Sequence, residues 1–156
     1  MNRQEDEKKP IAANRKARHE YTIEETCDAG IALIGTEVKS VRAGRVNLQD
    51  SFVRIENGEA WVHNLHISPY EQGGRWNADP KRRRKLLLHK REIMRLMGKY
   101  QERGLAIIPL SVYLQHGRIK LELGVGRGKK LYDRRRDIAE RETEMDRRRQ
   151  LSERQP

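Results

Sequence analysis

A run of five consecutive cations, Lys81–Lys85, is the first segment of this sequence with a clear chemical meaning. Cations in such a run release counterions when they bind nucleic acid, which makes the affinity steeply dependent on salt. A solvated basic loop is the alternative interpretation of the same residues. Because the surrounding chain is also basic, we predict that this segment contacts RNA.

A glycine-rich segment, Gly124–Lys130, could also bind phosphate. It lacks the spacing of a nucleotide-binding P-loop, and Leu131 follows Lys130 where that motif has Ser or Thr. Nucleotide hydrolysis is therefore not expected. Glycines allow backbone N–H groups to approach phosphate, and Arg127 and Lys129 lie beside them. The segment is predicted to bind an RNA backbone.

Residues suited to catalysis or metal binding are present but poorly arranged. Among the histidines, only His63 and His66 have a ligand-like spacing, and on a strand they would point to opposite faces. Ser51, Ser68 and Ser111 lie in no nucleophile motif. We expect no catalytic residue, no metal and no cofactor.

Carboxylates near the basic segments leave a nuclease open as the enzymatic alternative. Glu24, Glu25 and Asp28 could bind a metal ion there. Surface strand positions, or acceptors of hydrogen bonds from RNA bases and 2′-hydroxyls, are the favoured interpretation.

The few aromatic side chains could stack on unpaired bases. With so few, most are expected in the core. Trp76 and Tyr70, in a polar loop, are the ones expected at the surface.

The net charge of +11 at a length of 156 residues favours a polyanionic partner. Both ends of the chain are close to neutral, which leaves a surplus of +10 on residues 14–132. A membrane surface is the rival polyanion, but no basic amphipathic helix with a strongly apolar face is apparent. The absence of a long apolar run and of a signal peptide, together with the single Cys27, predicts a cytoplasmic protein in a reducing compartment.

The hydropathy pattern predicts several short strands and two helices. Asn57-Gly58 between alternating runs indicates a tight hairpin. Thr36 is expected to cap a short helix with Val38 and Val41 facing inward. In chain order the expected elements are strands over 21–29 and 31–34, a helix over 37–43, strands over 51–56 and 60–67, a loop over 69–80, a helix from His89 to Gly104, and strands over 105–115 and 118–125.

This pattern predicts a mainly β fold, a small closed antiparallel barrel of the oligonucleotide-binding kind with two or three flanking helices. The expected organisation is a disordered leader over 1–13, an RNA-binding barrel over 14–132, and a mixed-charge tail over 133–156 with helical propensity.

Several segments together resemble the SmpB family of tmRNA-binding proteins. The resemblance spans about residues 14–150 and is carried by residues 14–21, 29–31, 35–44, 47–51, 85–89 and 128–135, of which Gly35-Thr36-Glu37-Val38-Lys39-Ser40 and Arg84-Lys85-Leu86-Leu87-Leu88 are the most specific.

That resemblance implies binding to the tRNA-like domain of tmRNA, delivery to stalled ribosomes with elongation factor Tu, and a role in trans-translation with no enzymatic step. It also implies a tail that is unfolded when free and becomes helical in the decoding centre and the empty mRNA channel. A monomeric protein with no membrane partner is expected. A ribosomal or assembly protein, which would share the charge and the barrel, is the alternative binding protein.

The family's RNA-contacting positions and the basic segments together give the expected site. RNA contacts are expected from Asn14, Arg15, Lys16, Tyr21, Asp28, Lys85, Leu87, His89, Lys120, Arg127, Lys129 and Lys130. Decoding-centre and tail contacts are expected from Tyr132, Asp133, Arg134, Arg135, Ile138 and Met145. Three positions depart from the family pattern: Asp28 stands where Glu is usual, His89 where Asn is common, and Thr143 where some relatives carry an aromatic residue.

Overall fold

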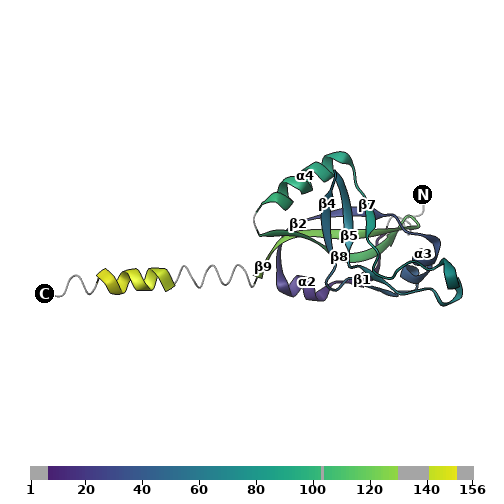
Figure 1. Ribbon diagram of the computed structural model, residues 1–156, viewed down its shortest axis with the longest axis horizontal. Coiled ribbons are helices and arrows are strands. Elements are labelled where there is room, and N and C mark those ends of the chain that lie inside the picture. The colour runs from purple at the N-terminus through teal and green to yellow at the C-terminus, as the bar shows by residue number, and fades with distance from the viewer. Residues whose placement is uncertain (1–6, 103, 130–140, 151–156) are drawn as a thin grey trace.

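The structure, a computed structural model, describes residues 7–102, 104–129 and 141–150 (Figure 1). Strands predominate. The elements are β1 Lys9–Ala13, α2 Arg15–Glu20, β2 Tyr21–Ile31, α3 Gly35–Arg42, β3 Val46–Asn47, β4 Phe52–Glu56, β5 Glu59–His63, β6 His66–Ile67, a 3₁₀ segment Glu71–Trp76, β7 Arg84–Leu87, α4 Lys90–Gln101, β8 Leu105–Gln115 and β9 Arg118–Gly128.

Six of these strands pair in a closed ring. The order is β8-β4-β5-β7-β2-β9, and β9 pairs back onto β8, with every pairing antiparallel. Strand β1 joins as a seventh strand on the outer side of β8, and β3 and β6 form a separate two-stranded sheet. In Figure 1, α4 lies on one side of the ring and α2 on the other. The predicted fold class is confirmed, as a ring of strands with flanking helices.

Two bulges decide which side chains enter the ring. In β8 the register against β9 skips Leu110, so Ile107 and Val112 both point into the main core although their positions differ in parity. Pro109, which has no N–H for a ladder hydrogen bond, lies beside this bulge. In β2 the register skips Glu24, which turns Ile23 outward while Ala29 stays in the core.

The side chains turned outward by the bulges form a second apolar cluster. Leu110 and Ile108 pack there with Ala17 of α2, and Ile23 and Tyr21 lie against them. This small cluster fixes α2 on the outside of the ring. The bulges therefore position the helix that carries Arg15 and Lys16.

The leader prediction was wrong for Lys9–Ala13. These residues form β1, which pairs with Ser111–Leu114 of β8. Ile11 and Ala12 are partly buried against the main core. This short segment next to charged residues is stabilised by a partner strand about a hundred residues away. Local composition does not reveal that partner.

The predicted hairpins are confirmed. Asn57 and Gly58 both have positive φ, 51° and 74°, as a type I′ turn requires, and they join β4 to β5. His116 and Gly117, at φ 53° and 70°, join β8 to β9. The glycine-rich segment extends β9 to Gly128, beyond the predicted end at Val125.

Both predicted helices are present, but their caps differ from expectation. Helix α3 begins after Ile34, whose N–H donates to the Glu37 side chain at 3.0 Å. The Thr36 hydroxyl instead donates to the carbonyl of Trp76 at 3.3 Å. Val41 is buried and Val38 is half-buried. At α4, His89 occupies the cap position without a side-chain cap hydrogen bond.

In the tail, residues 141–150 form a helix that lies apart from the ring in Figure 1, with every side chain exposed. Helical propensity was predicted for this segment. A lone helix of this length is marginal in water without a packing partner. The expectation that the free tail is unfolded stays a prediction.

Candidate nucleic-acid interface

A groove of about 630 Å³ lies on the outer face of the ring beside the start of α4. It brings together residues from β2, β7, β9 and the β7–α4 connection, which are far apart in the sequence. Five of the predicted RNA-contacting residues line it: Asp28, Lys85, Leu87, His89 and Lys120.

The register of three neighbouring strands explains this gathering. Gly30 of β2 lies opposite Leu87 of β7 on one side and opposite Lys120 of β9 on the other. A Cβ built on Gly30 would lie only 3.1 Å from the Cβ of Leu87. The missing side chain therefore lets Leu87 pack directly over Gly30.

Leu87 is 55% exposed although it lies in the middle of the sheet. An exposed leucine beside a cation suits the face of a nucleotide base and its phosphate together. Lys120 forms no ion pair with any residue that the structure describes, so its charge remains available to a ligand. Lys85, by contrast, lies 3.5 Å from Glu59.

Asp28 is the acid at the edge of this groove. Its carboxylate is held by Lys8 at 3.4 Å, and the Lys8 ammonium also lies 4.8 Å from the centre of the Tyr113 ring. Burial, reinforced by the nearby Asp28 carboxylate, raises the pKa of the Tyr113 hydroxyl. Asp28 thus already has one exposed cationic partner, which a nucleic acid would have to replace.

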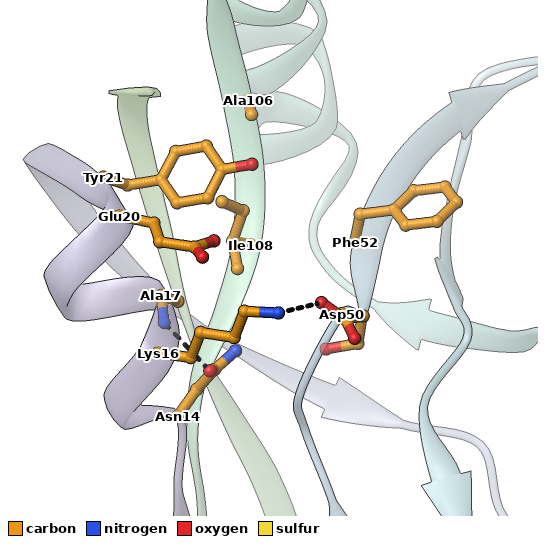
Figure 2. A pocket seen from close by; sticks show the side chains of 10 residues that line it. Asn14, Lys16, Ala17, Glu20, Tyr21, Asp50, Phe52, Ala106 and Ile108 are labelled. Carbon is orange, nitrogen blue, oxygen red and sulfur yellow. Dashed lines mark hydrogen bonds and ion pairs between the residues drawn. The ribbon is translucent and has the colours of Figure 1, made fainter. Parts of the chain in front are cut away.

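A second group of predicted residues lies around α2 (Figure 2). A pocket of about 190 Å³ is lined by Lys16, Tyr21 and Phe52, among others, and Lys16 reaches across it to Asp50 at 3.0 Å. Hydrogen bonding to Asp50 raises the pKa of Lys16. Arg15 is exposed on the same helix.

Asn14, at the floor of this pocket, has a structural role. It is 4% exposed. Its side-chain oxygen accepts from the N–H of Ala17 at 3.1 Å, and its amide donates to the carbonyls of Pro109 and Leu48 at 3.0 and 3.2 Å. Both N–H groups of the amide are thereby used inside the protein, and the direct RNA contact of Asn14 stays a prediction. Asn14 positions α2, which carries the exposed cations.

The prediction that the glycines of Gly124–Lys130 approach phosphate was wrong for two of them. Gly124 and Gly126 are buried ladder residues of β9. A Cβ on Gly124 would lie 2.7 Å from Leu110, and one on Gly126 would lie 2.4 Å from the Thr22 carbonyl oxygen. These glycines therefore make room for the second apolar cluster, which packs under α2. A glycine needed for packing looks the same in sequence as a glycine of a phosphate-binding loop.

The cations of that segment have separate surroundings. Arg127 lies 2.9 Å from Glu24 and 4.0 Å from Glu102. Lys129 is exposed at the end of β9. Lys130 lies outside the described residues, as do Tyr132, Asp133, Arg134, Arg135 and Ile138. Met145 is 66% exposed on the tail helix.

The five-cation run is not the solvated loop or uniform RNA surface that its sequence suggests. Arg84 is fully buried, and its guanidinium donates to Glu37 at 2.6 Å and to the carbonyls of Leu65 and Pro80 at 2.5 and 3.1 Å. Arg82 also pairs with Glu37. The predicted RNA contact therefore cannot involve Arg84, and it stays a prediction for the exposed members of the run.

Three other members of the run have exposed positions. Arg83 lies 2.7 Å from Glu56 and stacks over Trp61 at 4.1 Å, while Lys85 and Lys81 are exposed. Sequence reasoning missed Glu37 as the centre of this network. The available signal was an acidic residue inside the specific motif Gly35–Ser40. Glu37 lies three residues after the apolar Ile34, and its carboxylate accepts a hydrogen bond from the N–H of Ile34.

The Glu37 network is held in its ionised form. Burial opposes the charge on Glu37, but hydrogen bonds from Arg82, from the N–H of Ile34 and from Arg84 outweigh it and keep the pKa below 4.5. Burial lowers the pKa of Arg84 in turn, partly offset by Glu37. This buried pair ties α3 to β7 and so fixes the strand that carries Leu87.

The described part of the chain contains no helix long and apolar enough to cross a membrane. Among residues 7–102, 104–129 and 141–150, no cluster of His, Cys, Asp and Glu could hold a metal ion.

A small closed β-ring, a surplus of basic charge and a groove that combines a cation with an exposed apolar side chain define a protein of the RNA-binding β-barrel class. Comparison with known proteins narrows this class. The chain belongs to the SmpB protein family, whose profile matches residues 11–153. The family resemblance seen in the sequence is thereby confirmed.

Individual relatives agree with this assignment. The SsrA-binding protein of Desulforudis audaxviator is 65% identical over 136 residues, which cover 87% of this chain and 89% of that protein. The SsrA-binding protein of Caldicellulosiruptor saccharolyticus is 58% identical over 149 residues, covering 96% and 94%. A solved structure described as "tmRNA-SmpB: a journey to the center of the bacterial ribosome" is 55% identical, with a TM-score of 0.66, and covers 77% of this chain and 85% of that one.

Proposed function

We propose that this protein binds the tRNA-like domain of tmRNA through the groove and the exposed cations of α2 and β9, and so acts in trans-translation. The observation that carries the proposal is the meeting of Asp28, Leu87 and Lys120 in one groove. Membership of a family whose relatives are named SsrA-binding proteins supports the choice of RNA.

The groove has the chemistry that this ligand needs. Leu87 offers apolar contact to a base, and Lys120 offers a cation to a neighbouring phosphate. Asp28 can accept hydrogen bonds from a base or a 2′-hydroxyl once Lys8 moves to a phosphate. A transcript folded like tRNA would then bridge the groove and the cations Arg15 and Lys129.

The tail has a different role in this proposal. Residues 133–156 carry almost no net charge, so they add little to general RNA affinity. A fully helical tail would be about 36 Å long at about 1.5 Å per residue. We infer that Tyr132, Asp133, Arg134 and Arg135 enter the decoding centre, and that Ile138 and Met145 lie along the empty mRNA channel. Delivery with elongation factor Tu, as a monomer in the cytoplasm, completes the proposal.

Separate variants of the two parts test this division. Lys129→Glu with Lys130→Glu should abolish binding to the tRNA-like domain, measured by fluorescence anisotropy at a fixed salt concentration. A chain that ends at Tyr132 should bind this RNA normally but should not support peptide tagging on stalled ribosomes. A loss of affinity greater than tenfold in the shortened chain would contradict the separation of binding from rescue.

Two competing functions predict different results with the purified protein and RNA. A ribosomal or assembly protein would bind ribosomal RNA as tightly as tmRNA in direct competition. A nuclease would cleave RNA when a divalent metal is added to the pure protein. Either result would replace the proposed role, which is binding and requires no catalytic group.

A further inference from the structure

Trp76 is the most exposed large hydrophobic side chain that the structure describes, at 72%. It ends the 3₁₀ segment Glu71–Trp76, which lies beside α3 and contributes no residue to the groove (Figure 1). The indole is thus presented to solvent on a part of the molecule that the proposed function does not use.

The loop that carries Trp76 is held in place by internal hydrogen bonds. The Asn77 side chain accepts from the N–H of Tyr70 at 2.8 Å and donates to the carbonyls of Tyr70 and Gly74 at 2.8 and 3.1 Å. These bonds close the loop on itself. Such closure fixes the backbone next to the indole before any ligand arrives, which lowers the entropy that binding must overcome.

The closed loop is also attached to α3. The carbonyl of Trp76 accepts from the Thr36 hydroxyl at 3.3 Å. Gly73 packs so tightly that an added Cβ would lie 2.8 Å from the Thr36 methyl group. The Trp76 backbone is therefore fixed to the body of the protein while its ring remains open to solvent.

The surroundings of the indole are cationic. The guanidinium of Arg75 lies 5.5 Å from the centre of the Trp76 ring. In the same region, Lys39 lies over the Tyr70 ring at 5.3 Å, and Arg45 pairs with Glu71 at 3.7 Å. Arg75 is thus the cation next to the exposed ring, and Lys39 and Arg45 add positive charge beside Tyr70 and Glu71 of the same loop.

A nucleobase is the ligand that suits this combination. Base–aromatic stacking needs an open ring face, and the phosphate that accompanies the base needs a nearby cation. A protein partner would be expected to need further apolar side chains, but Trp76 is the only exposed large hydrophobic residue in the segment 69–81. We propose that Arg75 and Trp76 form a second RNA contact, which stacks one unpaired base and binds its phosphate.

Trp76 can report on its own occupancy. The chain has two tryptophans, and Trp61→Phe leaves Trp76 as the only one. A twelve-nucleotide single-stranded oligoadenylate should quench its fluorescence in the full-length protein. The same oligonucleotide in a duplex should not quench it, because paired bases are not available for stacking. Equal quenching by the duplex, or none when anisotropy of a labelled oligonucleotide shows saturation, overturns the proposal.

Affinities of matched variants provide an independent measurement. Trp76→Ala should weaken binding of the oligoadenylate by about 5- to 150-fold, the range for loss of one base–aromatic stack. Trp76→Phe should retain most of the affinity. Tyr100→Ala, which removes another exposed aromatic side chain, is the control and should have no such effect. Equal losses in Trp76→Ala and Tyr100→Ala would overturn the proposal.

The groove must be separated from this second site. Leu87→Asp changes the groove and should leave quenching of Trp76 by the oligoadenylate intact. Loss of the quenching in this variant would mean that the signal reports binding in the groove, which contradicts a second site. If instead the groove fails to bind the tRNA-like domain while Trp76 is still quenched, the second contact stands and the proposed function fails.

The source of the base is distinguished by titrating the same Trp61→Phe protein with purified tmRNA and, separately, with small ribosomal subunits. Quenching by either supports the contact and identifies its source. Quenching by neither RNA, or only by ribosomal protein freed of RNA, overturns it.

Discussion

The network around Glu37 and the groove around Lys120 are both cationic, yet they use their charges in opposite ways. In the first, Arg84 is fully buried and all its contacts are with protein. In the second, Lys120 has no ion pair within the described chain and stands next to an exposed leucine. The cations that lie consecutively in the sequence stabilise the fold in part, while those that meet through strand register are open to a ligand.

This difference shows why charge density along a sequence overstates the binding surface. Burying Arg84 requires a partner, because an isolated buried charge costs several kcal/mol. Glu37 provides it from α3. A cation is most available for RNA where no carboxylate already pairs with it, and that depends on the three-dimensional neighbours.

The largest effect is expected from Arg84→Met. This change leaves Glu37 buried with fewer partners and removes one donor from each of the Leu65 and Pro80 carbonyls, so the free energy of unfolding should fall by roughly 3–5 kcal/mol. Urea denaturation measures it. Arg83→Met, an exposed neighbour, should cost no more than about 1 kcal/mol. Similar losses in the two variants would contradict the contrast between buried and exposed cations.

A smaller loss is expected from Asn14→Ala. It removes the cap of α2 and the amide donor to the Pro109 and Leu48 carbonyls, so the free energy of unfolding should fall by about 1–3 kcal/mol. Binding of the tRNA-like domain, measured at a temperature where the variant is fully folded, should weaken far less than in Lys120→Glu. Equal weakening would support a direct RNA contact of Asn14.

The ionised Glu37 predicts a pH dependence of stability. Its pKa is lower in the folded protein than its ordinary value of 4.5. The folded state therefore binds fewer protons, and the contribution of Glu37 is fully present above about pH 4.5 and is lost as the pH falls through the folded pKa. Urea midpoints between pH 7 and pH 3 should fall less steeply in Glu37→Gln. Identical slopes would show that Glu37 is not the responsible group.

The smallest effect is expected from Lys120→Ala. Loss of one phosphate contact should weaken binding uniformly across RNA sequences and reduce the slope of log affinity against log salt by about 1. Stability should not change. Anisotropy titrations at several salt concentrations measure this slope, and an unchanged slope would mean that Lys120 does not contact phosphate.

The sequence predicted much of the fold because its strongest signals were local. The Asn57-Gly58 turn and the alternating runs on either side of it need only neighbouring residues to be recognised. Strand β1 and the bulge at Leu110 could not be predicted in this way, because both depend on pairing with strands that are distant in the sequence.

The predictions for the candidate site also differ in whether local sequence is enough to make them. Leu87 and Lys120 were identified through the family resemblance, and the register of Gly30 explains why they are close together. Gly126 and Arg84 were misinterpreted as RNA-binding positions because a glycine that relieves crowding and an arginine that meets a buried acid look the same, in sequence, as ligands for phosphate. Burial distinguishes these roles.

The last strand closes the ring, because Tyr21 at the start of β2 pairs with Gly128 at the end of β9, more than a hundred residues later. A nascent chain interrupted before Arg118 lacks the strand that joins β2 to β8, and with it Lys120. Such a fragment has an open seam and no complete groove. Completion of synthesis is therefore a physical condition for this protein to acquire its binding surface.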